Sequence, residues 1–331
     1  MEREGKWKNK SSTVIQCHTI MEEIGREEDC FIPTLDNCAT FQATVRVESP
    51  KILKAAKAKV VDIYKQKAQE GASKVPFQGE LLSLMAQEET DMAWRSLIYR
   101  VPRGVMAWAV RACTQTLATP DNLQRWGVRV DPKCAIDGCG KPCTLGHLLS
   151  CCTLSLDHYK YRHDSCLAHL VDKLVQNKPD TVKVTADLPG WKIRGGTVDP
   201  DLALTGQVPD IVIHDRSASP HKIYLLELTC PWDSPASFLK AHDRKTDRYN
   251  RLILDLEEAG LKAFNMPLEV WSWGYINPQN ISVLASISAV CKVKNYKKLC
   301  KTVSKISLVA SYKIWLARRS NDWAPGQFVK A

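Results

Sequence analysis

The sequence predicts a mixed α/β protein with a helical N-terminal part, a small cysteine-rich unit, a mixed sheet flanked by helices, and a helical C-terminal tail. Two observations lead to this prediction. Residues 158–275 show the order helix, three short strands, helix and strand. Just upstream, five of the 13 cysteines lie between Cys134 and Cys152. The 331 residues are enough for two or three compact units.

Residues 1–80 are the least regular part of the chain. Lys51 to Gln69 is typical of one basic amphipathic helix, and we expect residues 1–80 to be partly helical or disordered. A clearer helical period follows from Leu81 to about Leu117, interrupted at Pro102. Thr119-Pro120-Asp121 is a typical helix start. Residues 81–130 are therefore interpreted as a helical region.

After residue 155 the pattern alternates between helical and extended segments, and turn residues separate them. The expected helices are His158–Val175, Ser237–Ala259 and most of Asn280–Arg319; the expected strands are Thr181–Ala186, Pro209–His214, Ile223–Thr229 and Leu268–Tyr275. Asp215–Lys222 is interpreted as a hairpin connection, and Gly260 as the end of a helix. We assign residues 156–276 to the sheet domain and 277–331 to a basic helical region.

Composition narrows the range of functions. The 46 Lys and Arg exceed the 36 Asp and Glu, which gives a net charge of +10 and favours a polyanionic partner. The longest apolar stretch, Ile281–Val290, is too short to span a bilayer, and Met1–Lys10 lacks a signal-peptide core. We therefore expect an intracellular protein without a membrane segment. No motif supports nucleotide hydrolysis, zinc proteolysis or serine esterase chemistry, and we expect no small-molecule substrate.

The cysteine-rich unit, residues 131–155, has the spacing of a metal site. Cys134, Cys139, His147 and Cys152 supply three thiolates and one imidazole, a set that closes a tetrahedral zinc shell. A unit this small has little core, so a structural zinc ion would provide most of its folding energy. Spacing alone leaves Cys143 and Cys151 as rival ligands. The alternative is a chance cluster of reduced cysteines.

Two acids and a lysine form a second candidate site. Asp210 lies at the head of one predicted strand and Glu227 near the end of the next, so a hairpin would bring the carboxylates together at one edge of the sheet. Two hard oxygen ligands suit Mg²⁺ and phosphodiester chemistry. Lys245 lies on the apolar stripe of the following predicted helix, where it could hold a phosphate. The alternative is that the acids are surface groups and that Lys245 extends along the edge towards solvent.

These motifs, taken in order, carry a family resemblance. PDIV, LLELTCPWD and the AHDRKTDRY helix resemble the PD-(D/E)xK restriction-like nuclease fold, and more narrowly the endonuclease of site-specific non-long-terminal-repeat retrotransposons. In that group the catalytic lysine has moved from the strand to the following helix, which matches Thr229 on the strand and Lys245 on the helix. The group also carries an upstream Cys-Cys-His-Cys knuckle with a run similar to TLGHLLSCC, and NLQRWG resembles its post-polymerase region.

The resemblance implies a DNA endonuclease that nicks phosphodiester bonds. In that interpretation Asp210 and Glu227 bind catalytic Mg²⁺, and Lys245 stabilises the reacting phosphate. The residues Arg162 and His163 would support the site or contact DNA. The partner would be DNA, or structured RNA, and the location the nucleus.

The same resemblance assigns Arg248 and Tyr249 to the helix motif, and makes residues 81–130 the region that follows a polymerase. Three features depart from the family pattern: the four-residue gap between Cys134 and Cys139, Val208 in place of a basic residue, and the absence of any Asp-Asp pair for a polymerase site. The alternative function is a zinc-dependent nucleic-acid-binding protein without catalysis, a truncated or domesticated relic.

A basic segment follows the sheet domain. Cys291–Lys305 contains six lysines and no acid, and it is followed by Arg318-Arg319. Such a face would give non-specific, salt-sensitive binding to phosphates. The alternative is an ordinary solvated helix face.

Overall fold

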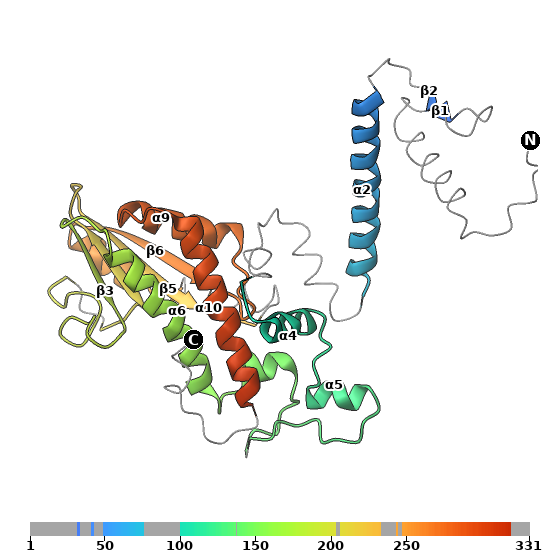
Figure 1. Cartoon of the computed structure of the whole chain (residues 1–331). Coiled ribbons are helices and arrows are strands. Elements are labelled where there is room, and N and C mark those ends of the chain that lie inside the picture. The colour runs from blue at the N-terminus through green and yellow to red at the C-terminus, as the bar shows by residue number, and fades with distance from the viewer. Residues whose placement is uncertain are drawn as a thin grey trace, which may run out of the picture. The chain divides into compact units, whose positions relative to one another are not determined.

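The computed structural model describes residues 32–33, 41–42, 49–75, 100–136, 138–202, 206–232, 243 and 247–318 (Figure 1). The chain divides into two compact units, Met1–Pro76 and Phe77–Ala331. In the first unit β1 (Ile32–Pro33) pairs antiparallel with β2 (Phe41–Gln42). The helix α2 (Ser49–Ser73) contains the whole segment that the sequence predicts as a basic helix.

The second unit is built around a four-stranded mixed sheet, which confirms the predicted α/β class. The strands β3 (Val182–Ala186), β4 (Ile211–Asp215), β5 (Lys222–Thr229) and β6 (Lys262–Glu269) lie in that order. The first three are antiparallel neighbours, and β6 runs parallel to β5. The predicted hairpin between β4 and β5 is present, because Asp215 pairs with Lys222.

Helices cover both faces of this sheet. On one face lie α6 (Leu156–Val175), α9 (Pro278–Val290) and α10 (Tyr296–Ala317), and their apolar side chains pack with Ile211 and Ile213 of β4. On the other face α8 (Asn250–Glu258) buries its apolar side chains against Val212 and Leu225. The alternation along β4 follows from the two-residue period of a strand, and it explains why this strand is apolar on both faces.

A second core lies beside the sheet. The helix α4 (Arg103–Cys113) packs against α10 through a group of aromatic residues that includes Trp108 and Trp315 (Figure 1). The short helix α5 (Pro120–Arg125) begins where the sequence predicts it, because the Thr119 hydroxyl accepts a 3.1 Å hydrogen bond from the Asn122 amide. No helix in the described part of the chain is long and apolar enough to cross a membrane.

The prediction of a strand over Leu268–Tyr275 is wrong beyond its first two residues. The observed strand, β6, pairs with β5 over all eight of its residues and ends at Glu269, opposite Thr229. A tight turn follows, closed by hydrogen bonds from the Trp271 amide to the Tyr275 carbonyl and from the Gly274 amide to the Trp271 carbonyl, at 3.0 and 2.7 Å. The alternating aromatic residues of this turn are buried in the second core, so their pattern resembled a strand without belonging to the sheet.

The predicted helix Ser237–Ala259 is described only in part. Its C-terminal portion is α8, and Gly260 follows with a positive φ of 77°, as expected after a helix. Immediately before α8, Tyr249 departs from helical geometry at φ −103° and ψ 6°. Lys245 lies outside the described residues.

Candidate metal centre and carboxylate edge

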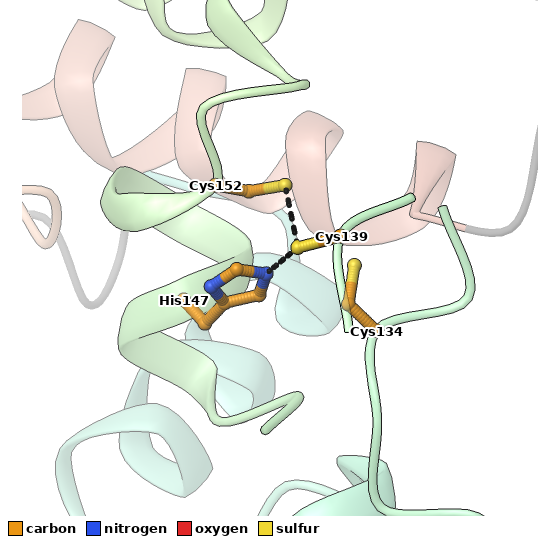
Figure 2. A group of neighbouring side chains, drawn as sticks. All are labelled: Cys134, Cys139, His147 and Cys152. Carbon is orange, nitrogen blue, oxygen red and sulfur yellow. Dashed lines mark hydrogen bonds between the residues drawn. The ribbon is translucent and has the colours of Figure 1, made fainter. Parts of the chain in front are cut away.

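Four side chains converge at the cysteine-rich unit. The ligand atoms of Cys134, Cys139, His147 and Cys152 all lie within 4.8 Å of one another (Figure 2). The Cys139 sulfur lies 3.3 Å from His147 Nε2 and 3.8 Å from the Cys152 sulfur. Three thiols and one imidazole nitrogen form a complete tetrahedral donor set, so this group can hold a metal ion such as zinc.

Two backbone segments position the four donors. Cys134 and Cys139 lie on a loop in which Lys133 bridges to Pro142 and the Cys134 amide donates to the Lys141 carbonyl at 2.8 Å. His147 is the first residue of a single wide helical turn, η2 (His147–Cys151), and Cys152 directly follows this turn, which is seen at the left of Figure 2. The Cys152 amide closes this turn onto the His147 carbonyl at 3.0 Å.

The Tyr159 hydroxyl, on α6, forms hydrogen bonds with both ends of the η2 turn. It donates to the His147 carbonyl at 2.9 Å and accepts from the Cys152 amide at 3.0 Å. The pKa of Tyr159 is raised because the side chain is buried, so the hydroxyl keeps its proton. The first residues of α6 therefore support two of the four donors.

The rival cysteines lie outside this group. Cys151 is exposed at the end of η2, and Cys143 is buried beside Cys134 without joining the four converging donors. Burial raises the pKa of the Cys134 thiol to about 12, whereas the Lys141 amide donates to Cys139 and lowers its pKa. Burial and the Lys141 charge lower the pKa of His147, which leaves a neutral imidazole as a metal donor requires.

The second candidate site lies where β4 begins and β5 ends. Asp210 stands one residue beyond the last paired positions of these strands, Ile211 and Leu226, and so lies opposite Glu227. The Asp210 amide donates to Glu227 Oε2 at 3.1 Å, and the Leu228 amide donates to Asp210 Oδ2 at 2.8 Å. The antiparallel register thus brings the two predicted carboxylates together at one edge of the sheet.

Glu227 is almost completely buried, with 2% of its surface exposed, and it has polar neighbours from the α8 side. The Tyr249 hydroxyl donates to Glu227 Oε2 at 2.8 Å, and an Arg248 nitrogen lies 3.5 Å from Oε1. Burial and the Glu227 charge raise the pKa of Tyr249, so its hydroxyl remains a donor. Arg248 itself is half exposed, so part of its guanidinium faces solvent next to the carboxylates.

His163 approaches the site from α6. Its Nε2 lies 3.1 Å from Asp210 Oδ2, and its Nδ1 lies 2.9 Å from Asp164 Oδ1. Burial opposes the charged imidazole, but the bonds to Asp164 and Asp210 outweigh it and raise the pKa of His163 to about 10. The imidazole is therefore a cation that links two carboxylates.

Arg162, the neighbour of His163, is buried at 1% exposure and lies between the two candidate sites. Its guanidinium donates to Ser150 of η2 at 3.1 Å, to the Cys230 carbonyl after β5 at 2.9 Å, and to Ser311 of α10 at 3.0 Å. This side chain therefore joins η2, the end of β5 and α10, and its burial leaves no guanidinium surface for a DNA contact.

A further acid at this edge, Asp187, was not predicted from the sequence. Asp187 follows β3 directly, and its amide donates to the Asp210 carbonyl at 2.9 Å, which places it on the third adjacent strand. Its carboxylate is paired with Lys192 at 2.5 Å. In the sequence, Asp187 is recognisable only as an acid immediately after a predicted strand. Its position beside Asp210 depends on the register of β3 and β4, which the sequence does not specify.

The described residues therefore bring together the four zinc-ligand candidates, and separately Asp210, Glu227, His163, Arg248 and Tyr249. Lys245 lies outside the described residues, so its position relative to the carboxylates is not part of this geometry. Compared with models of known families and with curated proteins, the chain matches none.

Proposed function

We propose that this chain is a metal-dependent DNA endonuclease that nicks phosphodiester bonds, and that it derives from the C-terminal part of a retrotransposon reverse transcriptase protein. The observation that carries the proposal is the pairing of Asp210 and Glu227 across β4 and β5 at one edge of the sheet. The net charge of +10 agrees with a nucleic-acid substrate.

The carboxylate edge fits a magnesium ion by its donor chemistry. Proteins hold Mg²⁺ through one or two carboxylates, with waters and substrate phosphates completing the shell. No described residue donates a hydrogen bond to Asp210 Oδ1, so that oxygen is available as a ligand. A divalent cation bound there would offset the charge that develops on the reacting phosphate.

The residues around the carboxylates would orient the two acids and bind the substrate phosphate. His163 orients Asp210, and Tyr249 orients Glu227, because each donates to one oxygen of its acid. Arg248 is partly exposed beside Glu227 and would contact a substrate phosphate. From the resemblance, Lys245 would stabilise the charge on that phosphate.

We assign a structural zinc ion to Cys134, Cys139, His147 and Cys152. The donor set leaves no open coordination position, which is typical of structural rather than catalytic zinc. The ion would hold the Cys134–Cys139 loop against η2. Ser150 of η2 in turn contacts Arg162, so the zinc unit would support the carboxylate edge as well as nucleic acid.

Nicking of supercoiled plasmid in Mg²⁺ tests the proposal. The native chain should nick, and Asp210→Ala and Glu227→Ala should not, while all three bind DNA equally when Mg²⁺ is left out. Asp187→Asn is the matched control, because this acid lies at the same edge but is paired with Lys192. DNA binding without nicking by the native chain would instead favour a zinc-dependent binding protein that has lost catalysis.

A further inference from the structure

The end of the sheet farthest from the carboxylates carries a group of basic side chains that the proposed site does not use. We name it the distal surface, and it consists of Lys183, Arg216, His221, Lys222 and Lys262. All of these side chains are exposed except Lys222, which is half-buried. The group joins residues from β3, β5, β6 and the β4–β5 connection.

Strand pairing brings these residues together. Lys222 pairs with Asp215 on one side and with Lys262 on the other. The Arg216 amide donates to the Thr181 carbonyl just before β3, at 3.0 Å, and the Lys262 amide donates to the His221 carbonyl at 2.9 Å. The pairing places all five residues at one end of the sheet. Because side chains alternate along a strand, Lys183 lies with His214 on the α8 face, and Lys222 and Lys262 lie on the α9 face.

A cavity of about 320 Å³ opens among these residues. Its lining includes Lys183, Arg216 and His221 from the distal surface, together with His214, which pairs with Lys183 across β3 and β4. The rings of His214 and His221 lie 5.5 Å apart. His214 Nε2 is buried and has no hydrogen-bond partner in the described part of the chain. A buried polar atom without a partner is costly, and a ligand in the cavity would satisfy it.

The charge of the distal surface is neutralised only in part, by Asp215, which pairs with Lys222 across β4 and β5 and whose pKa is lowered by the Ser217 hydrogen bonds and by the Lys222 charge. None of its five residues forms an ion pair with a described residue. Asp215 is buried and accepts from the Ser217 amide and hydroxyl at 2.9 and 2.6 Å. Asp199 and Asp201 both lie on the cavity wall, and Asp199 accepts a 3.2 Å hydrogen bond from the Asp201 amide. Asp201 is paired with Arg194 at 3.2 Å, and Asp180 is exposed nearby. The balance at this end is basic, and it favours an anion.

The basic segment after α9 begins at the same end. Burial raises the pKa of the Cys291 thiol to about 12, and the charges of Lys178 and Asp215 also influence this pKa. Cys291, at the end of α9, therefore lies near Asp215 of β4. Lys292 and Lys294 follow and are exposed. They lie in the connection between α9 and α10.

We propose that the distal surface binds the phosphate backbone of a nucleic acid, with one phosphate in the cavity beside His214, as a contact separate from the carboxylate edge. This inference rests on the proposed function for its choice of partner. His214 and Asp210 are four residues apart and share one face of the sheet, a span of about 13 Å. One nucleic-acid strand covers that distance in about four nucleotides, so a strand lying along the sheet would reach both places.

The test is equilibrium binding of a labelled DNA duplex in a buffer without Mg²⁺ or chelator, where the proposed cleavage lacks its metal and the structural zinc is kept. The variant is Lys183→Gln with Arg216→Gln, and the control is Lys74→Gln with Arg111→Gln, which removes the same charge from exposed positions elsewhere. Loss of two phosphate contacts should weaken binding and reduce the slope of log K against log [salt] by about 1.8 in the variant alone. Equal affinity and slope in the variant and the native chain would overturn the inference.

Two further arms separate this inference from its alternatives. In the native chain, a short oligonucleotide should shift the NMR resonances of the His214 imidazole at concentrations at which inorganic phosphate does not. An equal response to inorganic phosphate would mean that the cavity binds free anions, and it would overturn the proposed contact with a nucleic-acid backbone. Binding to anionic phospholipid vesicles that the variant loses, with DNA binding retained, would also overturn it. Nicking is measured separately. A native chain that never nicks, yet shows the charge-dependent binding difference, would refute the endonuclease and leave the distal surface intact.

Discussion

The Tyr249 hydroxyl donates a 2.8 Å hydrogen bond to Glu227, and the bond joins the start of α8 to β5. Both side chains are buried, Tyr249 completely and Glu227 at 2% exposure. A buried carboxylate needs donors that replace water, and this phenol is one of them. Arg248, the preceding residue, lies 3.5 Å from Oε1 of the same carboxylate and is half exposed.

Tyr249→Phe should lower the free energy of unfolding by about 1.5–3 kcal/mol, because it removes a hydrogen bond to a buried acidic group and keeps the ring. Urea unfolding followed by circular dichroism measures the change. Tyr296→Phe, at a half-buried tyrosine on α10, is the control and should change stability by less than about 0.5 kcal/mol. An equal effect of the two substitutions would contradict the stabilising role of the Glu227 contact.

Zinc content should depend on the four converging donors and not on the neighbouring cysteines. Native protein should contain one zinc ion per chain by elemental analysis, and Cys139→Ser should lose it together with much of its thermal stability. Cys151→Ser changes an exposed cysteine at the end of η2 and should keep the ion. Loss of zinc from both variants would mean that the ligand set is wrong.

Arg162→Gln should destabilise the second unit by at least about 3 kcal/mol, because Ser150, Ser311 and the Cys230 carbonyl lose a shared donor in a buried place. Hydrogen exchange should rise both in η2 and after β5. Arg162→Lys keeps one donating group and should be intermediate, whereas Arg103→Gln removes an exposed arginine and should have little effect. Faster exchange in only one of the two segments would show that Arg162 does not couple them.

Gly274→Ala should be far more damaging than Gly260→Ala. Both glycines have a positive φ, 80° and 77°, so each substitution costs about 1–2 kcal/mol of backbone strain. A Cβ at Gly274 would in addition overlap the Ser304 carbonyl oxygen, whereas at Gly260 no atom lies within 4 Å. The difference between the thermal unfolding midpoints of the two variants measures the cost of the steric overlap at Gly274. Similar midpoints would contradict close packing of the turn against α10.

Ser217→Ala should alter stability in a pH-dependent way. The Ser217 hydroxyl and amide bond Asp215 and lower its pKa in the folded state. A lowered folded pKa contributes stability above the unfolded value of about 3.9, and the contribution is lost as pH falls through the folded pKa. The variant should therefore be less stable by about 1 kcal/mol at pH 6, and the difference should vanish in strong acid.

Urea unfolding between pH 2 and pH 6 checks this prediction, with Ser219→Ala, at an exposed serine of the same turn, as the control. A stability difference that stays constant over the whole pH range would show that the Ser217 effect does not act through the Asp215 charge.

Local patterns made several elements predictable from the sequence. The α5 start follows from Thr119 and Pro120, because capping depends on adjacent residues alone. The same holds for β4 and β5, whose apolar runs flank a turn. The segment after Glu269 was not predictable in this way, because alternating aromatic residues match a strand pattern whether they pack on a sheet or in a helical core.

By itself, the sequence determined the mixed α/β class, the spacing of four metal donors and the identity of the two central carboxylates. Each of these depends on residues that are close along the chain or on one hairpin. Only the tertiary structure decided that Cys143 and Cys151 stand outside the donor group, that Arg162 is buried between η2 and β5, and that Asp187 lies beside Asp210. The physical reason is that strand register and helix packing join segments far apart in the chain, and no local pattern specifies which of their side chains meet.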